Sequence, residues 1–401
     1  MKHKFEGINQ ENVKQSNRSA ILKLLCSEGA MSRKDIAQII GLTPAAVTLI
    51  CSELMEEGVL VEKGEAEQEK RAGRRKILVD INYGFKKVLC IRIEVGETYL
   101  TLTDLAGNKL SEKSILTDRA ARPEAFLENV ATSSKNMMWE AGVAKEDILA
   151  GGVSVTGIVD RKKGISKNSF QIWDEPVDVK SILEEKLGVD IVVENNVKAC
   201  AYSELIYGDS RSKNNLMFVK WGPGVGSAIT IDHHVYQGRD FRGAEIGHYI
   251  VEKNGIPCRC GKRGCLETVI SSHAFVDEIK RNLNPKDMPK LIQWLEDDSH
   301  ELNANSIVEV IGLGDEGVRR IMDEKIDRLA RTVENIISVL NPDNIIVYGT
   351  VVEVPGIFER FIQCCQAYDP DLPEGYIKLS GLGDRITYRG PLAVAMDDYF
   401  V

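Results

Sequence analysis

The spacing of apolar side chains predicts three structural parts. Between residues 12 and 82, apolar positions recur at helical spacing, and two of the predicted helices are separated by Gly41. From residue 84, apolar and polar positions alternate as in antiparallel strands, and helices then interleave with strands. The same succession starts again near residue 214. We therefore expect an α/β protein with a helical amino-terminal domain and two lobes, at residues 1–82, 83–213 and 214–401.

The two helices around Gly41 have recognisable ends. Ser32 suits the N-cap of the first helix, and Thr43 followed by Pro44 suits the start of the second. The predicted apolar faces are Ile36, Ile39 and Ile40 on the first helix, and Val47, Ile50, Leu54 and Met55 on the second. Two short helices joined by a glycine turn are typical of a helix-turn-helix, which places its second helix in the major groove of DNA.

Candidate DNA contacts lie on these helices and on the hairpin that follows. Residues 59–82 have the pattern strand, turn, strand, which is typical of a wing, and its turn holds five cations around Gly73: Lys70, Arg71, Arg74, Arg75 and Lys76. Such a cluster suits phosphates or a narrow A·T-rich minor groove, whereas a charge run by itself would be a solvated loop. On the helices we expect DNA contacts from Ser32, Arg33, Thr43, Ala45, Ala46 and Thr48. The small side chains among them can touch thymine methyl groups or phosphates, but they have little capacity for bidentate base contacts.

A cluster of metal-ligating side chains follows in the second lobe. The segment RGAEIGHYIVEKNGIPCRCGKRGCLE, residues 242–267, contains His248, Cys258, Cys260 and Cys265. Three thiols and an imidazole suit a tetrahedral zinc ion, and the glycines of the CGKRGC turn let the backbone fold around it. Four protein ligands leave no position for a water molecule, so the predicted zinc is structural. Buried thiols without a metal are the alternative, and disulfides are a lesser one.

Composition narrows the functional classes. With 401 residues and 43% apolar content, the chain is long enough for several cores, and its nine cysteines suit a reducing compartment. No apolar run is long enough for a membrane span and the first residues lack a secretory h-region, so we expect a cytoplasmic protein without a membrane partner. The net charge of -9 argues against a protein that coats nucleic acid over its whole surface, but not against a small basic domain on an acidic body.

The motif GAEIGH, followed by G-x-x-C-x-C-G-x-x-G-C-x-E, resembles the signature of the ROK family, named for repressors, uncharacterised reading frames and sugar kinases. The helix-turn-helix followed by a wing with a GRR turn is similar to the ROK repressors, whereas the family's plain kinases lack this segment. The resemblance implies the actin-like ATPase fold of sugar kinases, with the ligand in the cleft between two lobes. It also implies that Glu245, His248 and Glu267 contact sugar hydroxyls and that zinc orients the imidazole of His248.

Further polar residues complete the sugar site that the resemblance implies. Asn195 and Asn196 lie in the segment that matches the family's E-N-D motif, and Asn168 offers another hydrogen bond. Trp173 offers a face on which a sugar ring could stack. Buried amides, carboxylates and an imidazole discriminate between sugars, because a missing hydroxyl leaves one of them unpaired.

The parts that a ROK kinase needs for catalysis are altered. The aspartate base of the kinases is replaced by Asn196, whose amide cannot accept a proton. The first phosphate loop, of the type D-x-G-G-T, is replaced by a segment in which Arg92 stands at the acidic position and Glu94 and Val95 replace glycines. Glycines of the second and third loops are retained, at residues 222–226 and at position 349. They are weak evidence for a nucleotide site, because glycine turns between strands are common. We therefore expect a protein that is not an enzyme.

These observations predict a sugar-responsive transcriptional repressor of carbohydrate-metabolism genes, which binds a palindromic double-stranded DNA operator as a homodimer or homotetramer. Its effector would be a small sugar or a sugar phosphate. Two other functions stay open: an ATP-dependent sugar kinase with a DNA-binding domain, and a sensor for which the metal is the signal. The sequence leaves open the operator, the identity of the sugar, the direction of its effect on DNA affinity, and whether a nucleotide still binds.

Overall fold

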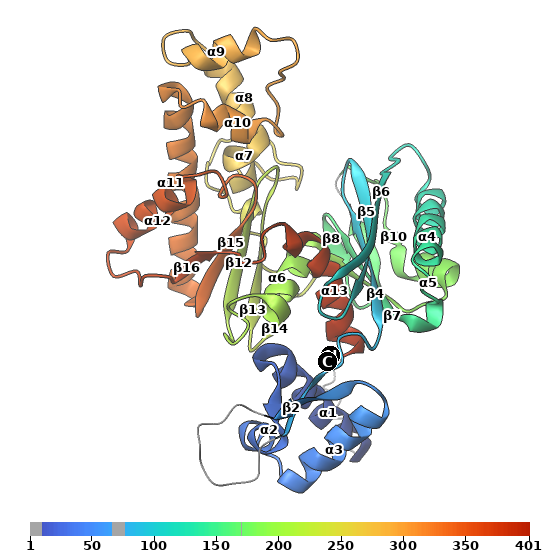
Figure 1. The fold of residues 1–401 in the computed structure, drawn as a ribbon. Coiled ribbons are helices and arrows are strands. Elements are labelled where there is room, and N and C mark those ends of the chain that lie inside the picture. The colour runs from blue at the N-terminus through green and yellow to red at the C-terminus, as the bar shows by residue number, and fades with distance from the viewer. Residues whose placement is uncertain (1–9, 66–76, 170) are drawn as a thin grey trace. The chain divides into compact units, whose positions relative to one another are not determined.

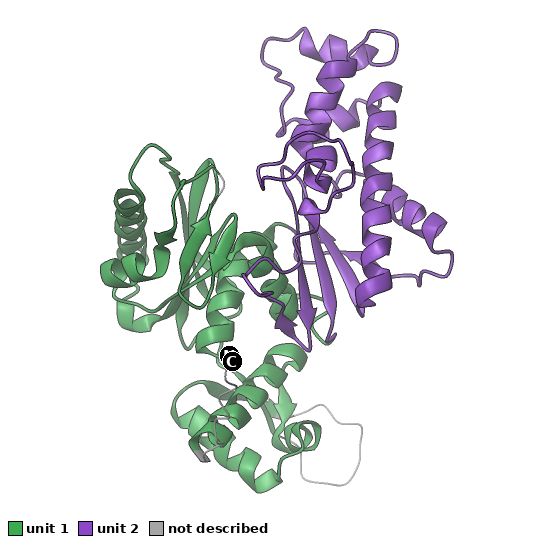
Figure 2. Ribbon diagram, turned by 180° about the vertical axis from the view of Figure 1, so that it is seen from behind, with its two compact units in different colours: residues 1–212, 384–401 green, residues 213–383 purple. Residues whose placement is uncertain are grey.

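The computed structural model (Figure 1) describes residues 10–65, 77–169 and 171–401. The chain folds into two compact units (Figure 2): unit 1 comprises residues 1–212 and 384–401, and unit 2 comprises residues 213–383. Unit 1 therefore contains the amino-terminal domain, the first predicted lobe and the last helix. The prediction of one lobe at residues 214–401 differs from this division, because the chain returns to unit 1 after residue 383.

The amino-terminal domain, called the head, is a winged helix-turn-helix. Its elements are α1 (Gln10–Glu28), β1 (Met31–Ser32), α2 (Arg33–Ile40), α3 (Pro44–Glu56), β2 (Leu60–Glu65) and β3 (Ile77–Ile81), with the sheet order β1-β3-β2. Ser32 caps α2 by accepting a hydrogen bond from the Asp35 N–H at 3.2 Å, and Thr43 caps α3 by accepting one from the Ala46 N–H at 3.2 Å. Between the helices Gly41 takes a φ of 71°, which glycine adopts without strain. The predicted helix-turn-helix and its helix ends are confirmed.

The core of the head combines side chains from its helices and its sheet: Ile21, Leu25, Ile36, Val47, Ile50, Leu54, Leu60, Val79 and Ile81. Phe400 and Val401, which follow α13 (Ile386–Tyr399), pack against the same core. The predicted apolar face of α2 is wrong at one position, since Ile39 is 57% exposed. Ile39 lies at the edge of a helix face whose buried centre is formed by Ile36 and Ala37.

The first lobe is a five-stranded sheet with helices on both faces. Its elements are β4 (Lys87–Ile93), β5 (Glu97–Asp104), β6 (Lys109–Leu116), α4 (Pro123–Glu140), η1 (Lys145–Asp147), β7 (Ile148–Val155), β8 (Ile158–Asp160), β9 (Ile165–Asn168), β10 (Val177–Asp178), α5 (Val179–Leu187), β11 (Ile191–Asn195) and α6 (Asn196–Tyr207). The strand order is β11-β7-β4-β5-β6; β4, β5 and β6 form an antiparallel meander, and β4, β7 and β11 are parallel. Helices α4 and α5 cover one face, and α6 and α13 cover the other (Figure 1).

Helix α13 packs closely on this sheet because glycines remove the side chains at the points of contact. A Cβ on Gly152 in β7 would lie 1.9 Å from the carbonyl oxygen of Pro391. Gly390 lies against α6, where a Cβ would be 3.1 Å from the carbonyl carbon of Ala199. The residues after Pro391, up to Met396, are fully buried. This packing is the reason why the last helix belongs to unit 1 and not to the second lobe.

Unit 2 is a second α/β lobe, with the strand order β14-β13-β12-β15-β16. Its elements are β12 (Leu216–Trp221), β13 (Val225–Ile231), β14 (His234–Val235), η2 (Ile246–His248), α7 (Leu266–Ile270), α8 (Ser272–Asn282), α9 (Pro289–Leu295), α10 (Ile307–Gly312), α11 (Glu316–Leu340), β15 (Asn344–Tyr348), α12 (Ile357–Tyr368) and β16 (Ile377–Leu379), and η3 (Gly383–Arg385) lies at the boundary. Strands β12, β15 and β16 are parallel, and β13 runs antiparallel to β12. Helix α11 packs against α7, α8 and α12.

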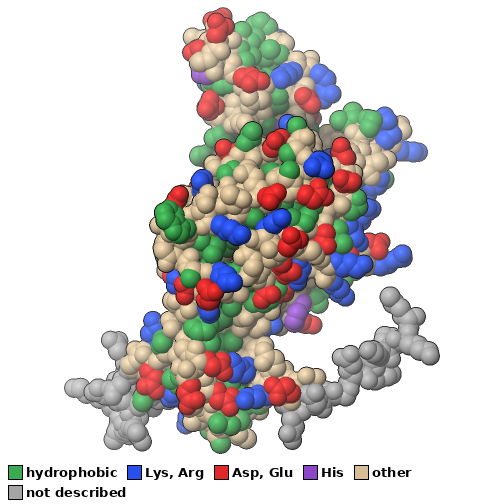
Figure 3. Space-filling view, turned by 90° about the vertical axis from the view of Figure 1, so that its right-hand side faces the viewer, with side chains coloured by type: hydrophobic (Ala, Val, Ile, Leu, Met, Phe, Trp, Pro, Cys, Tyr) green, Lys and Arg blue, Asp and Glu red, His purple; other side chains and the backbone are tan. Residues whose placement is uncertain are grey.

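Acidic and basic side chains lie next to one another on the head, which is at the bottom of Figure 3. Ion pairs connect its elements: Lys14 with Glu53 at 2.9 Å, Arg18 with Glu57 at 2.5 Å, Arg33 with Glu62 at 3.0 Å, and Lys63 with Asp80 at 4.0 Å. No single helix in the described ranges is long and apolar enough to cross a membrane. Helices α2 and α3 pass that test of length and composition only when they are taken together across a bend of 119°.

Candidate metal centre, ligand residues and nucleic-acid interface

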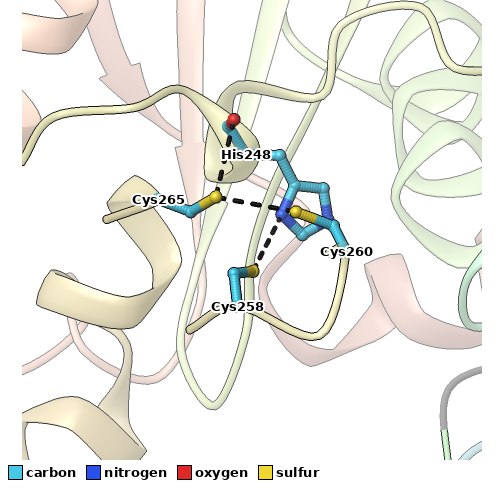
Figure 4. A group of neighbouring side chains, drawn as sticks. All are labelled: His248, Cys258, Cys260 and Cys265. Atoms are coloured by element: carbon cyan, nitrogen blue, oxygen red, sulfur yellow. Dashed lines mark hydrogen bonds between the residues drawn. The ribbon is translucent and has the colours of Figure 1, made fainter. Parts of the chain in front are cut away.

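Four side chains of unit 2 point toward one another as candidate metal ligands (Figure 4). Their ligand atoms, from His248, Cys258, Cys260 and Cys265, all lie within 4.8 Å of one another. The distance from His248 Nδ1 to Cys258 Sγ is 3.6 Å, and that from Cys260 Sγ to Cys265 Sγ is also 3.6 Å. In a tetrahedron with zinc–sulfur bonds of about 2.3 Å and zinc–nitrogen bonds of about 2.0 Å, such pairs are about 3.5–3.8 Å apart. The cluster could therefore hold a metal ion.

The backbone brings the cysteines together in a short hairpin. The Gly264 N–H donates to the Ile256 carbonyl at 2.9 Å, and the Cys258 N–H donates to the Lys262 carbonyl at 2.8 Å. Gly264 has a φ of 68°, and a Cβ there would lie 1.8 Å from the carbonyl oxygen of Glu252. Only glycine fits this position, so the turn predicted from the glycines of CGKRGC is confirmed.

The predicted disulfide alternative has no support from the structure. All nine cysteines are free thiols. The 3.6 Å between the sulfurs of Cys260 and Cys265 is far longer than a disulfide bond of about 2.05 Å. The choice is therefore between a metal centre and a cluster of reduced thiols.

Burial and the proximity of the sulfurs control ionisation in the cluster. Burial, and after it the neighbouring thiols, raise the pKa of Cys265 to about 12, and burial also raises the pKa of Cys258. Burial opposes ionisation of Cys260, but hydrogen bonds from the Lys262 backbone and the other thiols outweigh it and lower the pKa. Burial lowers the pKa of His248, which favours the neutral imidazole that ligates metals. The three thiols cannot all ionise without a compensating positive charge, which a bound dication would supply.

The Glu267 carboxylate lies close to this centre. Its side chain is 12% exposed, accepts a hydrogen bond from the Val225 N–H at 3.1 Å, and pairs with the Arg259 guanidinium at 3.1 Å. Glu267 acts electrostatically on the pKa of His248, so these two candidate sugar contacts share one neighbourhood. Glu245 precedes η2 directly and is half-buried. Arg259 was not among the predicted site residues, although its position between two cysteine ligands was a usable signal.

The remaining candidate sugar residues belong to unit 1. Asn168 ends β9 and is exposed, and Asn196 is the half-buried first residue of α6. The Asn195 Oδ1 caps α6 by accepting from two backbone N–H groups at 2.9 and 3.1 Å, while its Nδ2 donates to the Gly157 carbonyl at 2.6 Å. The Asn195 side chain therefore uses its oxygen and one of its two amide N–H groups in hydrogen bonds to the backbone, and the second amide N–H is left for a ligand.

The prediction that Trp173 offers a stacking face is wrong. The side chain is only 8% exposed, and its ring centroid lies 6.3 Å from that of Phe126. Its Nε1 donates a hydrogen bond to the Ser166 hydroxyl at 3.2 Å. Trp173 is part of the hydrophobic core of the first lobe, where its ring is covered by protein.

The side chains of the altered phosphate loop, at the end of β4, contact other side chains of the first lobe. The Arg92 guanidinium lies over the Tyr99 ring, 3.9 Å from its centroid, and its Nη1 is 3.4 Å from Glu94 Oε1. The Val95 side chain packs against the core of the lobe. A phosphate loop needs accessible backbone N–H groups and no opposing carboxylate. Here the Glu94 carboxylate lies within the loop, and the Glu94 N–H donates to the Glu97 carbonyl at 3.2 Å.

The exposed face of α3 is the candidate surface for the DNA major groove. Thr43, Ala45 and Thr48 are exposed, whereas Ala46 is half-buried. The Thr48 hydroxyl donates to the Pro44 carbonyl at 2.7 Å, so its hydrogen is used within the helix. Leu49, next to Thr48, is 62% exposed and was not among the predicted DNA contacts. Its position outside the predicted apolar face of this helix was the signal that could have revealed it.

Two predicted DNA contacts near α2 are engaged within the head. Ser32 is 4% exposed, and its hydroxyl donates to the Asp35 carboxylate at 2.7 Å. Arg33 donates to the Glu62 carboxylate at 3.0 Å. Neither placement supports a role in DNA contact. The predicted wing contacts Arg71, Arg74 and Arg75 lie outside the described residues.

Comparison with known proteins finds family matches for the amino-terminal head and for the two-lobed body. Residues 88–397 match the ROK family, and residues 15–61 match a winged helix-turn-helix DNA-binding family. The xylose repressor of Caldicellulosiruptor bescii is 24% identical over 393 residues, which cover 97% of this chain and 98% of the relative. The DNA-binding transcriptional dual regulator NagC of Escherichia coli K12 is 26% identical over 358 residues, which cover 89% of this chain and 86% of the relative.

Two solved structures show the same fold. A ROK family transcriptional regulator, described as a homolog of the E. coli MLC protein, aligns with a TM-score of 0.81 at 23% identity, over 96% of this chain and 97% of its own. A ROK family glucokinase from Streptomyces griseus, in complex with glucose and AMPPNP, aligns with a TM-score of 0.67 at 22% identity. The glucokinase alignment covers 99% of that chain but only 78% of this one.

The fold and the head together define a DNA-binding regulator built on a sugar-kinase-like body. The two-lobed α/β body and the winged helix-turn-helix confirm the predicted fold class. The chain belongs to the ROK family.

Proposed function

We propose that this chain is a transcriptional repressor of carbohydrate-metabolism genes and that a bound sugar controls its affinity for operator DNA. The observation that carries the proposal is a winged helix-turn-helix joined to a body that matches the ROK family. The resemblance to the family's E-N-D motif further implies that the amide of Asn196 stands at the base position. Relatives that align over most of this chain are named xylose repressor and N-acetylglucosamine repressor. Because a repressor acts on chromosomal DNA, we place its action in the cytoplasm of a bacterial cell.

The DNA contact is proposed to combine α3 with the cations of the wing. Several described cations of the head, Lys14, Arg18 and Arg33 among them, are paired with carboxylates of the head, which reduces their attraction for phosphates. Residues 66–76 contain five cations and two carboxylates, so they add the positive charge that phosphate binding requires. A homodimer or homotetramer would place two heads on two half-sites of a palindrome, about 34–36 Å apart.

The effector is proposed to be a sugar or a sugar phosphate. Glu245, His248 and Glu267 of unit 2 would contact its hydroxyls, together with Asn168, Asn195 and Asn196 of unit 1. The support comes from unit 2, where a largely buried carboxylate and a half-buried imidazole lie near each other. Polar groups of this kind select among sugars by the penalty of leaving one of them unpaired.

The metal is proposed to be a structural zinc held by His248, Cys258, Cys260 and Cys265. Three thiols and an imidazole form a complete tetrahedral set for this ion. Because Nδ1 of His248 faces the sulfurs, Nε2 at the opposite edge of the ring stays available for a hydrogen bond to the effector. Zinc would therefore fix the orientation of the imidazole and would leave no open position for catalysis.

We further propose that the body binds the sugar without phosphorylating it. An amide at position 196 cannot take the proton of a sugar hydroxyl. Arg92, Glu94 and Val95 form an ion pair and a packed apolar contact where a phosphate loop would be needed. Loss of the catalytic base or loss of the phosphate loop would each slow phosphoryl transfer. The base acts on the sugar hydroxyl, whereas the loop holds the phosphates of ATP.

The test is a selection of genomic fragments from the source organism on the purified, zinc-loaded protein. The selection is repeated with xylose, glucose, N-acetylglucosamine and their phosphates added one at a time. We expect a few palindromic fragments whose affinity changes with one of these sugars. Glu267→Gln should remove the sugar response and keep DNA binding, whereas Glu316→Gln, at an exposed position of α11, should change neither.

Two outcomes would contradict the proposal. The absence of any enriched fragment, with or without sugars, would mean that the head does not read an operator. ADP formation in a coupled assay with any of the sugars, abolished in Glu267→Gln, would instead support the kinase alternative.

A further inference from the structure

The groove-facing surface of α3 carries no residue type that makes bidentate hydrogen bonds to bases. Its sequence, Pro44–Glu56, reads PAAVTLICSELME and contains no Arg, Lys, Asn, Gln or His. The N-terminal part of a recognition helix normally contacts base edges, and the strong pairings with guanine and adenine use those absent types. A specific contact from this helix must therefore use another property of the base pairs.

The exposed side chains of α3 form a small apolar surface. Ala45, Thr48 and Leu49 are spaced i, i+3 and i+4, so they lie on one face of the helix, and all three are exposed. The Leu49 side chain is 62% exposed, and it lies outside the head core that Val47, Ile50 and Leu54 form. The hydroxyl hydrogen of Thr48 is used within the helix. This surface offers apolar contact and little hydrogen bonding.

The acidic residues of α3 do not change this chemistry. Glu53 is paired with Lys14 of α1. Glu57, which directly follows the helix, forms two hydrogen bonds with Arg18 of α1. Both of these carboxylates are thus tied to α1. The other acidic residue of α3, Glu56, is exposed but is the last residue of the helix, so the first turns of α3 present only neutral side chains.

We infer that α3 reads thymine through its C5-methyl groups and that Leu49 is the specificity-determining residue of the operator contact. The thymine C5-methyl is the only methyl group that an unmodified base pair presents in the major groove, and it is the group that alanine, threonine methyls and other apolar side chains contact. The inference rests on the proposed function. The inference adds that each half-site contains a thymine whose methyl group contacts Leu49, and that this thymine is recognised without a hydrogen bond.

The test uses operator DNA from the selection described above, in which single thymines are replaced by deoxyuridine, which lacks only the methyl group. Affinity of the full chain is measured by fluorescence anisotropy at fixed salt. We expect deoxyuridine at one or two positions of each half-site to weaken binding about fourfold per methyl, as burial of one methyl-sized group predicts. Deoxyuridine at the other positions should have no effect.

A variant cycle assigns the contact to Leu49. Leu49→Ala should weaken binding to the thymine operator roughly tenfold, since several carbons that touch the methyl group are removed. Leu49→Ala should bind the operator with deoxyuridine at a sensitive position as tightly as the thymine operator. In this variant the leucine side chain that would contact the thymine methyl group is absent, so loss of the methyl group has no further effect. Leu116→Ala is the matched control, since Leu116 on β6 is 74% exposed, and it should leave every affinity unchanged. The melting temperature of Leu49→Ala should equal that of the parent chain, because the side chain is not in the core.

The outcomes separate this inference from the proposed function. Specific operators whose affinity is unchanged by deoxyuridine at every position would overturn the methyl readout and keep the repressor. An equal deoxyuridine effect in the parent chain and in Leu49→Ala would keep methyl recognition but remove Leu49 from it. No specific operator at all would overturn both.

Discussion

Replacement of Cys260 by serine removes one of the four candidate zinc ligands while the hairpin keeps its backbone hydrogen bonds. The Cys258 and Gly264 N–H groups still donate to their partners at 2.8 and 2.9 Å, so the loop is weakened and not abolished. Structural zinc sites with four ligands are worth about 10–16 kcal/mol in small peptides, so one ligand represents roughly 3 kcal/mol. In a domain of the size of unit 2, 1 kcal/mol shifts the melting temperature by about 2–4 °C. We therefore expect a decrease of roughly 6–12 °C.

Two measurements decide this prediction. Elemental analysis should find about one zinc per chain in the parent protein and much less in Cys260→Ser. A chelator should lower the melting temperature of the parent protein toward that of the variant. Cys364→Ser is the matched control, because Cys364 is a half-buried thiol of unit 2 outside the cluster, and it should keep both zinc and most of the stability.

The sugar response provides the third readout. If zinc orients His248 toward the effector, Cys260→Ser should lose the sugar response at a temperature where both proteins are folded. A parent protein without bound zinc, or a variant that keeps its full response without zinc, would refute the proposed role of the metal.

Three further changes test other parts of the molecule. Asn196→Asp should give no ADP formation with any sugar, because the Arg92 ion pair still occupies the altered phosphate loop; turnover in a coupled assay would show that the base alone was missing. Replacing both Arg74 and Arg75 by alanine should reduce the slope of log affinity against log salt by about 1.8, or about 0.9 for each phosphate that is no longer neutralised; an unchanged slope would exclude these arginines from phosphate binding. Gly152→Ala should destabilise unit 1 by about 3 kcal/mol or more, since its Cβ would lie 1.9 Å from a carbonyl oxygen of α13; a urea midpoint equal to that of the parent chain would contradict the close packing of this helix.

The features that could be predicted from the sequence are those determined by short-range rules. Ser32, Thr43 and Gly41 mark helix ends because capping and left-handed turns involve residues within one turn of the chain. The metal ligands could be found because three of the four lie within eight residues, and the glycines between them report the tight hairpin. The helix-turn-helix and the two α/β lobes followed from apolar spacing for the same reason.

The features that could not be predicted depend on contacts between distant segments. The sequence of the last helix does not show that it packs on Gly152, far away in the chain. The burial of Trp173 depends on Phe126 and on the strands around it, so the same residue type suited either a core or a ligand. The pairing of Arg259 with Glu267 likewise required the three-dimensional turn around the metal ligands.

The discontinuity of unit 1 has a consequence for folding during synthesis. Its sheet and its DNA-binding head leave the ribosome early, but α13, Phe400 and Val401 follow only after the roughly 170 residues of unit 2. At about 5–20 residues per second, that interval is roughly 10–35 seconds. Throughout this time, the sheet face around Gly152 and one side of the head core lack their covering side chains. A nascent chain that pauses in unit 2 therefore carries a partly open first lobe, which exposes apolar surface to chaperones or to other unfinished chains.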